Sequence, residues 1–358
     1  MSWRVDAPRR ARTLQNDCDV ELVTQDPFVA SAKRRITEQR EPPKRKAALT
    51  ASCSGWSDRP VSTPAKDPST ATFSSAGGKT NANKQVMEVA TGPAFTGRMC
   101  AASRWIESQR PDSLFSDPLG FNLAGIKGRQ NAMGAWILVP RTRFGDDFLI
   151  EKYHSNGCRQ LVLLGAGMDA RAFRLNLPEL EVFEIDQQTT FDVKEPLLAH
   201  ERLTVKGRHA LGVDFNVPGE KETWPEKLIS AGFDVNIPTV WLLEGLVYYL
   251  PNSDFTLMQQ QISTLSAPRS ALFHDAVSRS YVDAKVVVAG EPFISGSDDY
   301  PRLWQKYGFG KNSRAINFEH IRVNRSTRKL DVSPGTSSEV DPARARGQLI
   351  VIFFHAEK

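Results

Sequence analysis

The sequence predicts an α/β protein: a doubly wound, mostly parallel sheet preceded by a helical cap. Short apolar runs alternate with helix-length amphipathic segments, and continuous apolar runs are typical of strands buried on both faces of a parallel sheet. Several runs end in a glycine or an acidic residue, at the strand ends where such sheets bind ligands. The expected strands are Gln160–Leu164, Glu181–Ile185, His209–Val213, Val240–Leu243, Ala271–His274 and Gln348–His355.

The first 90 residues differ from the rest in charge and composition. They hold 15 Lys and Arg against 10 Asp and Glu, whereas residues 91–358 hold 31 of each, so the net charge of +5 lies in this segment. It is rich in Ser, Thr and Pro and has neither helical nor strand periodicity. Such a segment cannot bury enough apolar surface to offset the entropy of ordering it. We expect a disordered basic tail over 1–90 and one folded domain over 91–358.

Charge, hydropathy and cysteine content exclude several classes of protein. A body without net charge has no electrostatic footprint for phosphate backbones, so nucleic acid is not an expected partner. No stretch approaches the roughly 20 apolar residues of a bilayer span, so we expect no membrane association. The cysteines lack a CxxC spacing, which excludes a zinc ribbon, and are too few for a disulfide scaffold. They favour a reducing, cytoplasmic location; they are Cys18, Cys53, Cys100 and Cys158.

Upstream of the first strand the pattern is helical. Apolar residues at helical spacing predict a helix over residues 96–109. Residues 131–153 predict a pair of helices broken near Pro140, because a proline removes a backbone donor and clashes with the preceding turn. These helices would form the cap.

The first two strands end in residues suited to a nucleoside ligand. The first ends in Gly165-Ala166-Gly167, and two glycines permit a tight turn into a helix expected to begin near residues 168–171. The second ends in Asp186, a carboxylate that could accept hydrogen bonds from ribose hydroxyls, although capping of the next helix is an alternative. Glu184 would point into a covered face, so Asp186 is the preferred ligand.

The third and fourth strands end in the same kind of group. Asp214 and Phe215 could contact an adenine ring, although an ordinary Asx turn is an alternative at Asp214. Glu244 follows four apolar residues, where a carboxylate is costly to bury without a partner such as a ligand ammonium group. Because the carboxyl ends of parallel strands meet at one edge of a sheet, four such ends in order indicate one binding site.

These residues resemble the leucine carboxyl methyltransferase family, most of all its branch of S-adenosylmethionine-dependent O-methyltransferases. The resemblance covers roughly residues 92–280 and the closing strand. It implies a Rossmann-like class I methyltransferase fold that binds S-adenosylmethionine. The motifs that carry it are Arg141-Thr-Arg143-Phe, Leu164-Gly-Ala-Gly-Met-Asp169-Ala-Arg171, Phe183-Glu-Ile-Asp186 and Glu244-Gly-Leu-Val-Tyr-Tyr-Leu250.

The resemblance also implies roles for single residues. Arg141 would hold the carboxylate of the cofactor, Gly165 would pass against its methionine part, and Glu244 would face its ammonium group. The other implied contacts are those of Asp186 with the ribose hydroxyls, and of Asp214 with Phe215 at the adenine. The family branch usually has leucine at the position of Phe215, and residues 280–347 match it loosely, so the methyl acceptor stays open.

The predicted activity is therefore methyl transfer to an oxygen, with a carboxylate of a small molecule or a protein C-terminus as the implied acceptor. A carboxylate is already ionised and needs no general base, whereas a hydroxyl would need one, for which His274 and Tyr248 are candidates. Two other interpretations stay open. The Gly-x-Gly-x-x-Ala pattern of residues 165–170 also fits an NAD(P)-dependent oxidoreductase, and a non-catalytic binding protein could use a methyltransferase fold.

Overall fold

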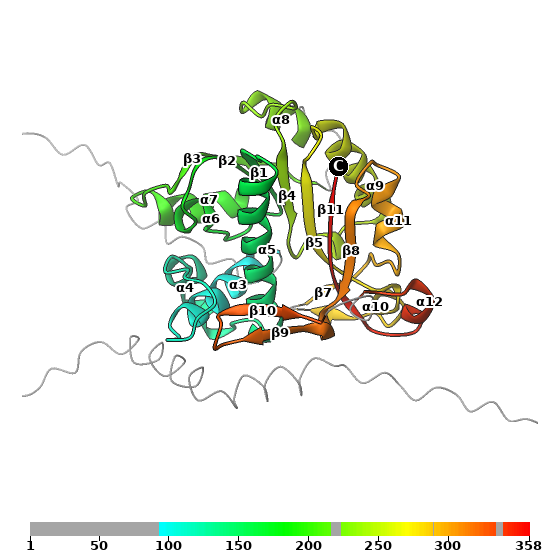
Figure 1. Ribbon diagram of the computed structural model, residues 1–358. Helices are drawn as coiled ribbons and strands as arrows, with labels where there is room; N and C mark the ends of the chain where they lie inside the picture. Colours follow the sequence, from blue (N-terminus) through cyan, green and yellow to red (C-terminus); the bar gives the residue numbers. More distant parts are fainter. Residues whose placement is uncertain (1–92, 216–222, 289, 334–338) are drawn as a thin grey trace, which may run out of the picture.

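The computed structural model describes residues 93–358 apart from 216–222, 289 and 334–338, and the expected tail over residues 1–90 lies outside the described residues. A seven-stranded sheet crosses the molecule in the order β3-β2-β1-β4-β5-β11-β8 (Figure 1). The first five of these strands pair in parallel. Strand β11 runs antiparallel to both of its neighbours. This confirms the predicted Rossmann-like architecture, a doubly wound and mostly parallel sheet.

The sheet consists of β1 (Gln160–Leu164), β2 (Leu177–Asp186), β3 (Val205–Gly212), β4 (Thr239–Leu243), β5 (Ala271–Val277), β8 (Lys311–Asn317) and β11 (Val351–Glu357). Two antiparallel pairs are β6 (Val287–Val288) with β7 (Glu291–Pro292), and β9 (Ile321–Asn324) with β10 (Lys329–Val332). The helices are α3 (Pro93–Ser108), α4 (Gly120–Gln130), α5 (Ala135–Ser155), α6 (Arg171–Arg174), α7 (Gln188–Leu198), α8 (Trp224–Ser230), α9 (Asn252–Leu265), α10 (Arg279–Asp283), α11 (Tyr300–Gln305) and α12 (Pro342–Ala345), with 3-10 turns η1 (Val247–Tyr249) and η2 (Phe318–His320).

The sheet is covered on both faces, which explains its continuous apolar strands. All five residues of β1 are buried. Val162 and Leu164 enter one core with residues of α8, α9 and α11, whereas Leu161 and Leu163 enter a second core with residues of α5. Helices α3 and α4 pack with α7 in a third cluster and form the cap. Because burial on both faces produces a continuous apolar run, the expected bounds agree most closely with the observed ones for the central strands β1 and β4.

The two edge strands differ from expectation. Strand β3 begins at Val205 and ends at Gly212, so the expected range His209–Val213 covers only its second half. Strand β8 was not expected at all. Most residues of both strands are half-exposed or exposed, because an edge strand has only one neighbouring strand and less cover. The apolar pattern that identifies central strands is therefore weak in them.

The predicted break near Pro140 is wrong, because α5 is one helix that continues through this proline. A proline inside a helix costs about 3 kcal/mol. Burial of the rest of the helix outweighs that cost. Phe144 and Phe148 pack their rings 4.8 and 6.2 Å from the ring of Phe273 on β5, and Leu149 is fully buried in the same core. Packing on the sheet therefore holds the helix together across a local breaker.

His274 of β5 should make stability depend on pH. Its Nε2 accepts a hydrogen bond from the indole Nε1 of Trp304 at 2.9 Å, and burial lowers its pKa to about 4. In the unfolded chain His274 binds a proton below pH ~6.5, whereas in the native chain His274 stays neutral until the pH approaches ~4. The contribution of neutral His274 to the free energy of unfolding is therefore fully present above pH ~6.5 and is lost as the pH drops toward ~4. We expect His274 to account for a loss of about 2–3 kcal/mol between pH 7 and 4.5.

Urea unfolding of the wild type and of His274→Gln at these two pH values would test this expectation. Glutamine keeps an oxygen that can accept from Trp304 but does not titrate, so the variant should lose less stability on acidification. Carboxylate groups contribute equally to both proteins and cancel in the difference. An equal loss in the two proteins would contradict the prediction.

Candidate functional site

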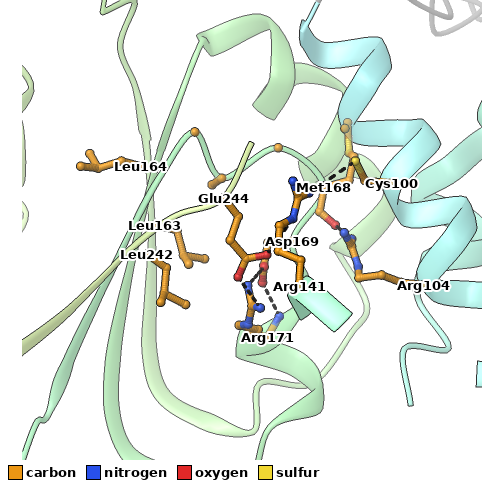
Figure 2. Close-up of a pocket in the computed structure, with 14 residues that line it drawn as sticks. Cys100, Arg104, Arg141, Leu163, Leu164, Met168, Asp169, Arg171, Leu242 and Glu244 are labelled. Carbon is orange, nitrogen blue, oxygen red and sulfur yellow. Dashed lines mark hydrogen bonds and ion pairs between the residues drawn. The ribbon is translucent and has the colours of Figure 1, made fainter. Parts of the chain in front are cut away.

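A pocket lies at the carboxyl ends of β1 and β4, under the cap (Figure 2). Its volume is about 450 Å³, including the part open to solvent. The residues that line it are Gly97, Cys100 and Arg104 of α3, Arg141 of α5, the backbone and side chains of residues 163–169, Arg171, Leu242 and Glu244.

The loop between β1 and α6 turns tightly along this pocket. Gly165 has φ +71° and Gly167 has φ +47°, in the left-handed region that favours glycine. The backbone nitrogens of Gly165 and Ala166 donate to the carbonyl oxygen of Ile185 at 2.9 and 3.1 Å, which ties the loop to β2. The helix that follows begins at Arg171, the last residue of the expected stretch 168–171, and it is only four residues long. The loop backbone, rather than a long helix, therefore forms this wall.

Asp186 lies behind the loop and holds it in place. Its Oδ2 accepts from the backbone nitrogen of Gly167 at 2.7 Å. Its Oδ1 accepts from the backbone nitrogen of Gln187 and from Oγ1 of Thr190, at 2.7 and 2.8 Å. A carboxylate has about four lone-pair sites, so the bonds among the described residues leave about one of them for a ligand. Asp186 thus supports the start of α7 and the glycine loop together.

Glu184, two residues earlier, has no access to solvent. It accepts hydrogen bonds from Lys194 Nζ at 2.7 Å and from Arg208 Nε at 2.8 Å. The structure thus places Glu184 in a buried ion-pair cluster, in the covered face that the sequence predicts for it.

Asp214 and Phe215 lie near Asp186 and outside the pocket lining. The Oδ2 of Asp214 is 3.3 Å from Nε2 of Gln187, the residue that follows Asp186. Phe215 packs against the core on the face covered by α8 and α9. The predicted site residues therefore fall into two groups. Arg141, Gly165 and Glu244 line the pocket, whereas Asp186, Asp214 and Phe215 lie together beside the ends of β2 and β3.

Arg141 and Glu244 are more than 100 residues apart in sequence, yet they meet in the pocket. Arg141 Nε is 3.6 Å from Glu244 Oε2. Arg141 Nη1 donates to Asp275 Oδ2 at 2.8 Å, and Nη2 lies 3.8 Å from Cys100 Sγ. Arg141 Nε is buried and makes no hydrogen bond to the described residues. A buried donor in a pocket wall that lacks a hydrogen-bond partner among the described residues suits an anionic ligand group.

Arg171 completes a cluster of buried charges. In the sequence this residue stands out only as the end of the motif that begins at Leu164. Its guanidinium donates to Glu244 Oε1 at 2.6 Å and to Asp169 Oδ2 at 2.5 Å (Figure 2). It also donates to Asp146 Oδ1 at 2.8 Å. Burial raises the pKa of Glu244, and Arg171 and Arg141 oppose this shift only in part. Burial also acts to raise the pKa of Asp146, but the nearby arginines outweigh it and hold that pKa below its usual value.

Neither candidate for a general base suits that role in this structure. His274 is in the core, bonded to Trp304, and does not line the pocket. Tyr248 Oη donates to Asp275 Oδ2 at 3.3 Å, and burial raises the pKa of Tyr248 well above its usual value.

In the part of the chain that the structure describes, no cluster of three or more His, Cys, Asp or Glu could hold a metal ion. Within the same residues, no helix is long and apolar enough to span a bilayer.

Comparison with known proteins points to one enzyme family. The family model described as leucine carboxyl methyltransferase matches residues 98–263. A protein of Streptomyces coelicolor named "Putative S-adenosyl-L-methionine-dependent methyltransferase" is 37% identical over 226 residues, which cover 57% of this chain and 78% of that protein. A protein of Streptomyces avermitilis with a name of the same kind is 34% identical over the same length and coverage. The matched residues 98–263 contain every pocket-lining residue except Gly97.

Proposed function

The chain belongs to the leucine carboxyl methyltransferase family and is an S-adenosylmethionine-dependent methyltransferase, and we propose that it methylates a carboxylate oxygen, on a small-molecule acid or a protein C-terminus. The observation that carries the mode of cofactor binding is the meeting of Arg141 and Glu244 in one pocket at the ends of β1 and β4. Opposite charges at that spacing match the zwitterionic amino-acid end of S-adenosylmethionine.

The residues of the pocket fit this cofactor. Arg141 Nε, a buried donor with no bond to the described residues, would hold the carboxylate of the cofactor. Glu244 uses Oε1 for Arg171 and would offer Oε2 to the ammonium group. The backbone at Gly165 would pass against the methionine part. When bound, S-adenosylmethionine supplies a methyl group on a positively charged sulfur.

The nucleoside end would extend toward the second group of residues. Asp186 has about one lone-pair site left for a ribose hydroxyl. Asp214 and Phe215 would contact the adenine, and phenylalanine keeps the apolar character that leucine provides in the family branch. The cap helix α3 and the short β1–α6 loop would exclude water from one side of the site, which aids a displacement reaction.

The lack of a general base among the pocket-lining residues favours a carboxylate acceptor. The titratable groups that line the pocket are paired arginines and carboxylates, together with Cys100. A carboxylic acid loses its proton at neutral pH without help, whereas an alcohol must lose it to a base during the reaction. Alignment of an ionised oxygen with the methyl group would then be the main contribution of the chain.

The pocket suits a nicotinamide dinucleotide less well. Asp169 lines the pocket just ahead of α6, where the pyrophosphate of a dinucleotide would lie. A carboxylate at that place repels an anion, and a helix of four residues offers only a weak dipole. Calorimetric titration with S-adenosylmethionine and with NAD separates these readings. Binding of NAD alone would overturn the methyltransferase assignment.

The acceptor class can be tested with cofactor that carries a labelled methyl group. Incubation with an extract should yield label that is released as methanol in mild base, because methyl esters hydrolyse there and methyl ethers do not. An Arg171→Met preparation, which lacks the partner of Glu244, serves as the control for label transfer by other proteins. Label that resists base would contradict the carboxylate proposal but leave methyl transfer in place.

Asp186→Ala should weaken binding of S-adenosylhomocysteine and of adenosine by about 1.5–3 kcal/mol each, because both ligands lose a charge-assisted hydrogen bond to the ribose. Asp186→Asn should lose less, since one acceptor oxygen remains. Calorimetry on the two variants checks the order of the losses. Normal binding of adenosine by Asp186→Ala would show that the ribose lies elsewhere.

A further inference from the structure

We propose that Asp275, at the carboxyl end of β5, is a positioning residue that holds Arg141 and Glu244 apart so that both can bind the amino-acid end of the cofactor. Asp275 does not line the pocket. It acts through residues that do, and the inference rests on the function proposed for that site.

The pleat of β5 explains why Asp275 can reach α5. Alternate residues of a strand share a face, so Asp275 is on the face of Phe273. The ring of Phe273 packs 4.8 Å from that of Phe144 on α5. Arg141 is one helical turn before Phe144 and therefore lies on the same side of α5. Its Nη1 reaches Asp275 Oδ2 at 2.8 Å, and Asp275 is only 3% exposed.

Asp275 also fixes the turn that carries Glu244. Its Oδ1 accepts from the backbone nitrogen of Gly245 at 2.6 Å, and its Oδ2 lies 3.3 Å from Oη of Tyr248. Gly245 has φ +73°, a conformation that few other residues adopt. One buried carboxylate therefore ties α5, the β4–η1 turn and η1 to the end of β5.

The position of Arg141 between two carboxylates gives Asp275 its effect. Arg141 Nε is 3.6 Å from Glu244 Oε2, beyond hydrogen-bond distance, while Nη1 is bonded to Asp275. Without the charge of Asp275, the guanidinium would turn toward Glu244 and bond to Oε2. That bond would use both the donor meant for the cofactor carboxylate and the acceptor meant for its ammonium group.

The test compares S-adenosylhomocysteine with adenosine, which lacks the amino-acid end. Asp275→Asn keeps an oxygen for the Gly245 N–H but removes the charge that holds Arg141. We expect this variant to bind S-adenosylhomocysteine 10- to 100-fold more weakly and adenosine within 2-fold of the wild type. Because Asp275 acts through Arg141, the double variant with Arg141→Met should bind no more weakly than Arg141→Met alone.

A matched control breaks another buried ion pair of the sheet. Glu357 of β11 accepts from Lys152 Nζ at 2.8 Å, on a strand that does not line the pocket. Glu357→Gln should lower the melting temperature and leave both affinities unchanged. If Asp275→Asn does not fold, Asp275→Glu decides the question, because it keeps the charge but moves the carboxylate by one methylene. That variant should lose affinity for S-adenosylhomocysteine alone.

Three results would overturn the inference: wild-type affinity for S-adenosylhomocysteine in the folded Asp275 variant, an equal loss for adenosine, or additive losses in the double variant. Failure of the wild type to bind S-adenosylhomocysteine would instead overturn the proposed function, and this inference with it. The two failures are therefore distinguishable in one set of titrations.

Discussion

Arg171→Met should lower the free energy of unfolding by about 3–5 kcal/mol, because it leaves buried carboxylates without their cation. Arg171 is 2% exposed and donates to Asp146, Asp169 and Glu244, all within 2.8 Å. Asp146 keeps a second partner in Arg174, so the loss should concentrate on Asp169 and Glu244. Proton uptake by these carboxylates would relieve part of the cost, and the variant should be least impaired at low pH.

Urea unfolding measures this loss, with Arg279→Met as the control. Arg279 pairs with Asp283 one helical turn away, and both side chains are more than half exposed. An exposed pair of this kind contributes at most about 1 kcal/mol. Arg171→Lys should fall between the two, because a single ammonium group cannot reproduce the fork of bonds. A loss in Arg171→Met no larger than in the control would show that the cluster contributes little to stability.

The central strands could be predicted from the sequence, whereas edge strand β3 was predicted only in its second half and edge strand β8 not at all. The predicted bounds of β1, Gln160–Leu164, are those observed, because burial on both faces leaves a continuous apolar run. Strand β8 has the sequence Lys-Asn-Ser-Arg-Ala-Ile-Asn and is half exposed, so no apolar run identifies it. Pro140 shows the opposite error. A strong local signal for a helix break is overridden by packing that depends on residues far along the chain.

The residue pattern predicts the site as far as its strand ends, and the family resemblance adds Arg141. The order of apolar runs with acidic or glycine ends brings Gly165 and Glu244 to one edge of the sheet. Asp275 was missed because the fifth strand was expected to end at His274, one residue before it. The role proposed for Asp275 depends on its contact with Arg141, 134 positions away in the sequence. Such a pairing depends on the curvature of the sheet and the placement of α5, and no spacing in the sequence reports it.

The two charged side chains Arg141 and Glu244 should determine how tightly the pocket binds the cofactor. Arg141→Met and Glu244→Gln should each weaken binding of S-adenosylhomocysteine by about 2–5 kcal/mol, because each leaves a charge of the ligand unpaired in a partly dry site. Both variants should fold. Asp275 would keep the Gly245 N–H and Tyr248 as donors, and Arg171 would keep its two aspartates.

Adenosine again provides the control, since it lacks the amino-acid end and should bind both variants as it binds the wild type. This pattern is the reverse of that expected for Asp186→Ala, which should lose both ligands. An oxidoreductase reading predicts no effect of either substitution on NAD, because NAD carries no amino-acid group. Unchanged binding of S-adenosylhomocysteine in both Arg141→Met and Glu244→Gln would remove these residues from the cofactor site, whereas loss in only one would show which charge of the zwitterion the pocket holds.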